Sequence, residues 1–176
     1  PETVLLDNRD AIFKPHVLTL WAGRQKLRIV NSDPIAQNVA FAPPGDRTAN
    51  IVLAPYSPSS PAPEAIWDFR RAQPLPIPVH CNYHSWELAY ILPHGNPYST
   101  VTDQTGRFEL SRIPVGDHEF FFVHEHLGPL GFALTLNGVV HRCERGRLEL
   151  RISSEGVDIG SIRIPGPPSP TTPDPT

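Results

Sequence analysis

Short stretches of apolar residues, often alternating with polar ones, recur along this chain between turn residues. Because alternate side chains of a strand point to opposite faces, such stretches predict strands with one buried face. They occur at residues 12–13, 16–21, 26–30, 37–41, 65–69, 88–92 and 118–123. Residues 74–79 carry proline at every second position and predict an extended segment. No helix of more than two turns is expected.

Turn residues predict how several of these strands connect. Asp103-Gln104-Thr105-Gly106 predicts a hairpin over residues 98–110, with a left-handed glycine near its turn. A final hairpin is expected between residues 147–152 and 159–164. Residues 42–63, rich in Pro, Ala and Ser, predict a surface loop. The spacing of the turns predicts an all-β, Greek-key β-sandwich that is extended by C-terminal β-hairpins.

Three parts are expected along the 176 residues. Residues 1–96 would form the sandwich. Residues 97–164 would form the hairpin extension, packed on the first part. Residues 165–176 contain too few apolar side chains to order themselves and predict a disordered, proline-rich tail.

Composition and charge narrow the classes of function. With 15 Lys and Arg against 18 Asp and Glu, the chain predicts no basic face for nucleic acid and no polybasic membrane anchor. No apolar run approaches the roughly 20 residues that span a bilayer. The chain begins at Pro1 without a signal-peptide pattern, which favours a mature or truncated protein. Nucleophile-elbow and phosphate-binding glycine motifs are absent, and the chain is predicted not to be an enzyme.

The segment from Pro78 to Glu87 carries the strongest chemical signal. Cys81, His84 and Glu87 follow one another at intervals of three residues. A thiolate and an imidazole together select copper or zinc over magnesium or calcium. Glu87 stands where a thioether would make the usual weak axial ligand, and the chain contains no methionine.

Four motifs carry a resemblance to a known group of proteins. They are Phe13-Lys14-Pro15-His16, Asn31-Ser32-Asp33-Pro34 with Gln37-Asn38, Cys81-Asn82-Tyr83-His84-Ser85-Trp86, and Pro97-Tyr98-Ser99-Thr100-Val101-Thr102-Asp103 with Gly106-Arg107-Phe108. Over about residues 4–165 the chain resembles bacterial extracytoplasmic cupredoxin-like proteins of the methylamine-utilisation and planctomycete type. The part after residue 96 resembles carboxypeptidase regulatory-like domains. The resemblance implies copper, single-electron transfer, a redox protein partner, and a periplasmic or secreted location.

The departures from that group fall on the metal ligands. Gln37 stands where the group has its first histidine ligand, and Glu87 stands where it has methionine. The resemblance therefore implies a metal site of Cys81, His84 and Glu87, with Gln37 as a weak fourth ligand. Such a set resembles the red-copper variant of the fold. Zinc in a tetrahedral arrangement and no metal at all are the alternatives.

Several interpretations would leave the loop without metal. A disulfide between Cys81 and Cys143 would remove the thiolate. Glu87 could be a surface carboxylate, and Gln37 could form only local hydrogen bonds. The chain would then be a metal-free binding or scaffold module of a larger envelope protein.

Four further histidines and one tryptophan carry expectations of their own. Strand alternation turns His80 away from Cys81, and His94 is expected to be exposed. His124 and His126 share one face of an extended segment and could form a second metal site. Trp86 is expected to be a packing plug that shields the loop.

Overall fold

The computed structural model describes residues 2–164, and every element in this range is a strand. The chain divides into two compact units between Ser111 and Arg112, here called the N-terminal and C-terminal units. Residues 97–111 therefore belong to the N-terminal unit. That residues 97–164 form one module, packed on the first, remains a prediction. The predicted tail, residues 165–176, lies outside the described residues.

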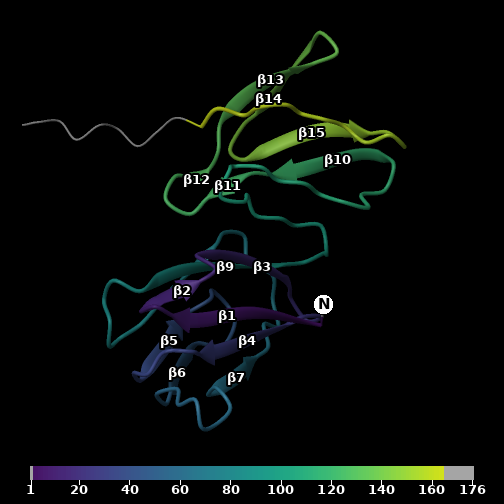
Figure 1. The fold of residues 1–176 in the computed structure, drawn as a ribbon. Helices are drawn as coiled ribbons and strands as arrows, with labels where there is room; N and C mark the ends of the chain where they lie inside the picture. The colour runs from purple at the N-terminus through teal and green to yellow at the C-terminus, as the bar shows by residue number, and fades with distance from the viewer. Residues whose placement is uncertain (1, 165–176) are drawn as a thin grey trace, which may run out of the picture. The chain divides into compact units, whose positions relative to one another are not determined.

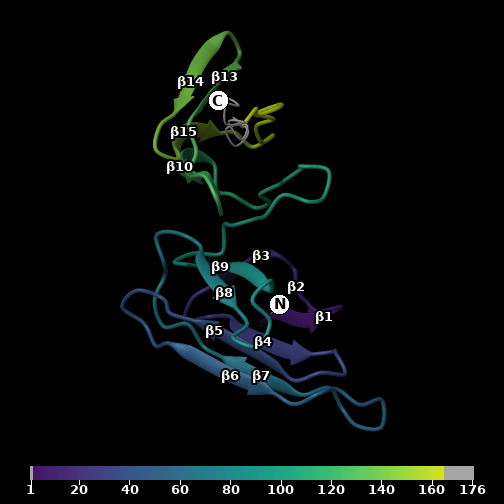
Figure 2. The ribbon, with the colours of Figure 1, turned by 90° about the vertical axis from the view of Figure 1, so that its left-hand side faces the viewer.

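Two sheets form the N-terminal unit (Figures 1 and 2). The four-stranded sheet has the order β2-β1-β4-β7, and the five-stranded sheet has the order β3-β9-β8-β5-β6. The strands of the first sheet are β1 (Thr3–Arg9), β2 (Ile12–Lys14), β4 (Lys26–Asn31) and β7 (Glu64–Trp67). Those of the second are β3 (Val17–Trp21), β5 (Gln37–Phe41), β6 (Ala49–Leu53), β8 (Ile77–His80) and β9 (Leu88–His94). The β1–β4 and β3–β9 pairs are parallel, and the other pairs are antiparallel.

Apolar side chains from both sheets form one buried core, which confirms the predicted all-β sandwich. In β4, Leu27 and Ile29 are fully buried, whereas Lys26 and Arg28 are exposed. In β8, Ile77 and Val79 point into the core and His80 points out. The same alternation buries the next residue, Cys81, and this sets the direction of its thiol.

The C-terminal unit contains three two-stranded sheets. They pair β10 (Gly116–Phe121) with β15 (Arg147–Ile152), β11 (Val123–His124) with β12 (Gly128–Pro129), and β13 (Phe132–Leu136) with β14 (Val139–Cys143). The buried members of its small core are Leu134, Cys143, Leu148, Leu150 and Ile152. Each unit thus has a core of its own.

Both predicted C-terminal hairpins differ from the structure. The turn at Asp103 forms, with Asp103 N donating to Arg107 O at 2.8 Å, but no strand flanks it within residues 98–110. Almost every side chain there is exposed, so neither face is buried to hold a strand pair. β15 pairs with β10 rather than with residues 159–164. The apolar residues of β15 find partners there, since Phe120 lies opposite Leu148.

Several strands of the structure lie outside the predicted segments, among them the short β12. β1 begins at the N-terminus, and β6 lies inside the predicted loop of residues 42–63. The β13–β14 hairpin turns at Asn137-Gly138, whose φ values are +50° and +79°. Such an Asn-Gly pair between apolar stretches is a strong hairpin signal, because both turn positions need positive φ. This hairpin was therefore predictable from the sequence.

Candidate metal centre

The loop from Cys81 to Glu87 connects two antiparallel neighbours of the five-stranded sheet. Cys81 directly follows β8, and Glu87 directly precedes β9. The loop closes on itself, because Glu87 N donates to His84 O at 3.0 Å and Cys81 N donates to Glu87 O at 3.4 Å. These backbone bonds bring the first, middle and last side chains of the loop to one place.

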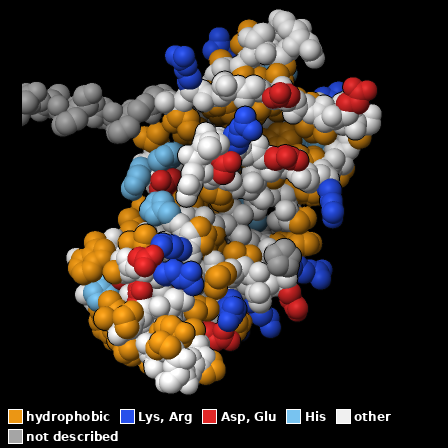
Figure 3. Space-filling model, viewed as in Figure 1, with side chains coloured by type: hydrophobic (Ala, Val, Ile, Leu, Met, Phe, Trp, Pro, Cys, Tyr) orange, Lys and Arg blue, Asp and Glu red, His pale blue; other side chains and the backbone are white. Residues whose placement is uncertain are grey.

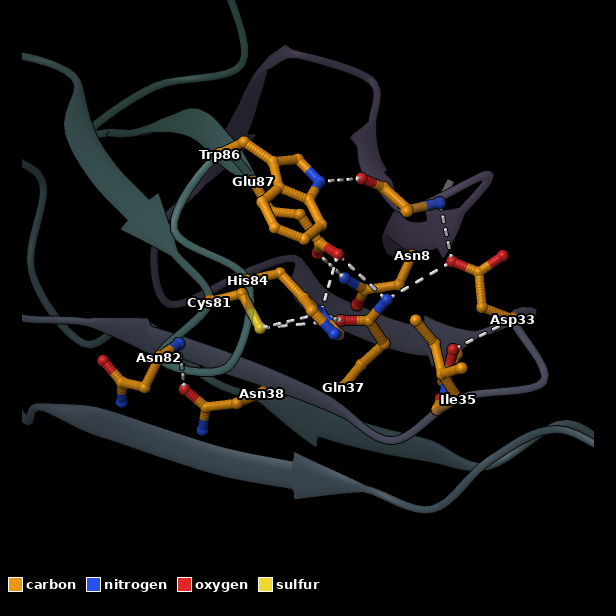
Figure 4. A network of polar contacts seen from close by, with 12 residues as sticks. Asn8, Asp33, Ile35, Gln37, Asn38, Cys81, Asn82, His84, Trp86 and Glu87 are labelled. Carbon is orange, nitrogen blue, oxygen red and sulfur yellow. Dashed lines mark hydrogen bonds and ion pairs between the residues drawn. The ribbon is translucent and has the colours of Figure 1, made fainter.

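The donor atoms of these three side chains converge (Figure 4). Cys81 Sγ lies 3.7 Å from His84 Nδ1, which lies 3.1 Å from Glu87 Oε1. One ligand atom from each residue lies within 4.8 Å of the other two. Within residues 2–164 this is the only group of three or more His, Cys, Asp or Glu side chains so arranged. The cysteine and glutamate are buried, and the imidazole is 19% exposed.

Gln37 adds an amide to this group. It begins β5, which lies beside β8 in the sheet, and its side chain is fully buried. Its Oε1 lies 3.1 Å from His84 Nδ1 and accepts a hydrogen bond from Cys81 Sγ at 3.5 Å. Its Nε2 donates to Glu87 Oε1 at 3.0 Å. The amide oxygen therefore faces the thiol and the imidazole.

Glu87 is buried, with 1% of its surface exposed, so the interpretation as a surface carboxylate is wrong. A carboxylate removed from water is costly unless it accepts hydrogen bonds. Glu87 Oε1 accepts from Gln37, and Glu87 Oε2 accepts from Asn8 Nδ2 at 2.9 Å. Asn8 belongs to β1 of the other sheet, so the carboxylate is held between the two sheets. Asn8 lies 79 positions from Glu87 in the sequence, and no local pattern there indicates this contact.

Trp86, expected to be a packing plug that shields the loop, has 64% of its surface exposed. Its ring lies next to the imidazole of His84, with centroids 5.2 Å apart and planes tilted by 38°. Its Nε1 donates to the carbonyl oxygen of Ala11 at 3.0 Å. The indole is thus tethered to the β1–β2 turn and lies against the one partly exposed member of the group.

The structure also tests the expectations for the cysteine pair and for the histidines outside the loop. Both cysteines are free, so the interpretation as a disulfide is wrong. His80 is exposed on the face of β8 opposite to Cys81, as predicted. His94 is half-buried rather than exposed, and this burial lowers its pKa. His124 Nδ1 accepts a hydrogen bond from His126 N at 3.1 Å, and a second metal site there remains a prediction.

The chemistry of the donors suits a small transition-metal ion, and two of their three separations lie near those of a tetrahedral site. Donors bonded at about 2.0–2.3 Å to a tetrahedral ion lie roughly 3.3–3.8 Å from one another. The thiol–imidazole and imidazole–carboxylate distances here are 3.7 and 3.1 Å. Thiolate, imidazole and carboxylate are each ligands of zinc and copper.

Comparison with solved structures finds amicyanins among the proteins that this chain resembles. A copper(I) form of a methionine-to-alanine mutant of amicyanin is 14% identical, with a TM-score of 0.43, over 52% of this chain and 82% of that one. Amicyanin from Paracoccus versutus is 16% identical, with a TM-score of 0.43, over 53% of this chain and 82% of that one. No protein-family model and no curated protein matches the sequence. Identities and TM-scores this low transfer no ligand set and no activity.

Surface charge and hydropathy agree with the composition. Acidic and basic side chains are interspersed on the face shown in Figure 3. No helix long and apolar enough to cross a membrane occurs in the described part of the chain. The resemblances to the planctomycete group and to carboxypeptidase regulatory-like domains remain predictions.

Proposed function

We propose that the N-terminal unit binds one copper ion through Cys81, His84 and Glu87, with zinc as the competing metal. The amide oxygen of Gln37 would be a weak fourth ligand. The observation that carries the proposal is the convergence of a thiol, an imidazole and a carboxylate within 4.8 Å at a largely buried position. Burial of this kind keeps water from the thiol and strengthens its interaction with a cation.

The donor set indicates the role of each side chain. Cys81 provides a soft thiolate and His84 a neutral imidazole, which together suit copper. Glu87 provides a hard, charged oxygen in place of a thioether, and such a ligand favours Cu(II) over Cu(I). A bound copper ion would supply one-electron redox chemistry at a low potential. We propose single-electron transfer with a redox protein partner in the periplasm or outside the cell, as the sequence resemblance implies.

A Cu(II) titration of the reduced, metal-free protein tests the proposal. We expect an intense thiolate-to-copper charge-transfer band that saturates at one equivalent, together with an electron paramagnetic resonance signal. Cys81→Ser should abolish the band. Cys143→Ser is the matched control, because both cysteines are free and 3% exposed. A band that persists in Cys81→Ser would contradict the proposal.

A metal-free binding module is the second candidate, and one observation favours it. The polar atoms of Gln37 and the carboxylate of Glu87 already have hydrogen-bond partners within the protein. Metal that binds only the native state adds about 2.7 kcal/mol of stability at a concentration of 100 Kd. Equal melting temperatures with copper, with zinc and with EDTA, and no charge-transfer band, would therefore support the metal-free module.

A further inference from the structure

We infer that Asp33 is a positioning residue: it orients the amide of Gln37 so that Oε1, rather than the NH₂ group, faces the thiol and the imidazole. The inference rests on the proposed metal-binding function and deepens it. It names the residue that determines which atom of Gln37 is available as the fourth ligand. Asp33 has no polar contact with Cys81, His84 or Glu87 among the described hydrogen bonds, so its effect on the site passes through Gln37.

The neighbours of Gln37 decide which way the amide points. Its Nε2 lies between two carboxylates, 3.3 Å from Asp33 Oδ2 and 3.0 Å from Glu87 Oε1. A flipped amide would place its carbonyl oxygen against both carboxylates, where neither side can donate a hydrogen bond. It would also turn two N–H donors, which have no lone pair for a metal, toward the position of the ligands. The two carboxylates therefore select the orientation that offers an oxygen.

Asp33 is itself held in place by the β1–β2 turn. Its Oδ1 accepts from Asp10 N at 2.8 Å, and its Oδ2 accepts from Ala11 N at 2.9 Å. Asp10 and Ala11 have φ values of +61° and +56°, a region that non-glycine residues adopt at a cost. The buried carboxylate of Asp33 satisfies both turn N–H groups and cannot turn away from Gln37 without losing them. Figure 4 shows this carboxylate between the turn and the amide.

Asp33→Asn tests the inference. The new NH₂ group would take an acceptor either from Ala11 N and Gln37 Nε2 or from Asp10 N, so the turn loses one bond in both orientations. In the copper-loaded protein we expect a shifted charge-transfer band, a changed copper hyperfine coupling, and roughly 10-fold weaker copper binding, as for other outer-shell partners of ligands. The same band and hyperfine coupling as in the unchanged protein would overturn the inference.

Asp46→Asn is the matched control for general damage to a turn. Asp46 also holds backbone N–H groups, those of Arg47, Arg70 and Arg71, and no described hydrogen bond joins it to the site. We expect it to lower the stability of the protein while leaving the copper spectrum unchanged. A spectrum that shifts equally in both variants would show that any loosened turn disturbs the site, and would also overturn the inference.

A double-mutant cycle separates an effect through Gln37 from an independent one. Gln37→Leu removes the amide that Asp33 is inferred to orient. In that background, Asp33→Asn should leave the copper spectrum unchanged. A spectral shift as large as in the parent protein would mean that Asp33 acts by another route.

A measurement without metal keeps this inference distinct from the proposed function. In ¹⁵N nuclear magnetic resonance, the side-chain NH₂ of Gln37 should exchange slowly, and faster in Asp33→Asn. If the protein binds no copper but this difference appears, the proposed function fails and the orienting role stands. If copper binds but neither exchange nor spectrum responds to Asp33→Asn, the proposed function stands and the orienting role fails.

Discussion

The two units differ in what they bury. Eight polar or charged side chains are buried among the described residues, and all of them lie in the N-terminal unit: Asp7, Asn8, Asn31, Asp33, Gln37, Asn38, Gln73 and Glu87. The described core of the C-terminal unit is apolar apart from the thiol of Cys143. Moving a polar group out of water costs free energy. A core between paired strands therefore does not need such residues for its stability. Four of the eight, Asn8, Asp33, Gln37 and Glu87, meet in one hydrogen-bond network, which surrounds the proposed metal site.

The two cysteines, one in each unit, show the same difference between polar and apolar surroundings. Each is 3% exposed. Cys81 Sγ has the Gln37 amide and the His84 imidazole beside it, whereas Cys143 Sγ donates to the carbonyl oxygen of Leu130 at 3.5 Å. Burial raises the pKa of the Cys143 thiol, and the backbone N–H of Gly146 offsets this only in part. Burial therefore does not distinguish the two thiols, whereas their polar neighbours do.

The largest expected change in stability tests whether the units are independent. In Gly146→Ala the new Cβ would lie 2.6 Å from Phe121 Cε2 and 2.8 Å from Phe122 O, at a φ of +83°. Strain and overpacking together should destabilise the C-terminal unit by about 2–4 kcal/mol. All three tryptophans lie in the N-terminal unit, so their fluorescence reports only that unit. We expect the circular dichroism transition to move and the fluorescence transition to stay.

Gly156→Ala is the control for that variant, because its φ is +82° and no atom lies within 4 Å of the added Cβ. It should lower the stability of the protein by only about 1–2 kcal/mol, the cost of a positive φ in a residue with a Cβ. If Gly146→Ala moved the fluorescence transition as far as the circular dichroism transition, the two units would unfold together. The two units would then not be independent in stability, although each has its own core.

A smaller effect is expected when the polar network loses its acceptor. Glu87→Leu leaves the side-chain N–H groups of Asn8 and Gln37 without their bonds to the carboxylate. We expect a loss of about 1–3 kcal/mol in urea unfolding of the metal-free protein, followed by tryptophan fluorescence. Glu64→Leu, which removes a half-exposed partner of Arg28, should cost less than about 1 kcal/mol. A Glu87→Leu protein as stable as the parent would show that the network is not needed for the fold.

The smallest expected effect concerns pH. Burial lowers the pKa of His94 below its usual 6.5, so the folded protein binds this proton less readily than the unfolded chain does. The resulting stability is present above about pH 6.5 and is lost as the pH falls below it. His94→Gln should flatten the decline of unfolding free energy between about pH 7 and pH 5. Identical pH profiles for the two proteins would contradict this assignment.

Local patterns in the sequence determined a substantial part of this protein. The alternation in β4 and β8, the lack of long helices in residues 2–164, and the spacing of Cys81, His84 and Glu87 are properties of neighbouring residues. They were predictable because side-chain direction in a strand depends on local backbone geometry. The Asn137-Gly138 hairpin belongs with them, because its two turn residues are adjacent in the sequence.

Tertiary structure alone decided the environment of those residues. Nothing near Glu87 in the sequence indicates that it is buried, because Asn8, which holds its carboxylate, lies on another sheet. The pairing of β15 with β10 and the contact of Asp33 with the Asp10-Ala11 turn likewise join distant residues. Burial and hydrogen-bond partners depend on which segments pack together, and a local pattern does not contain that information.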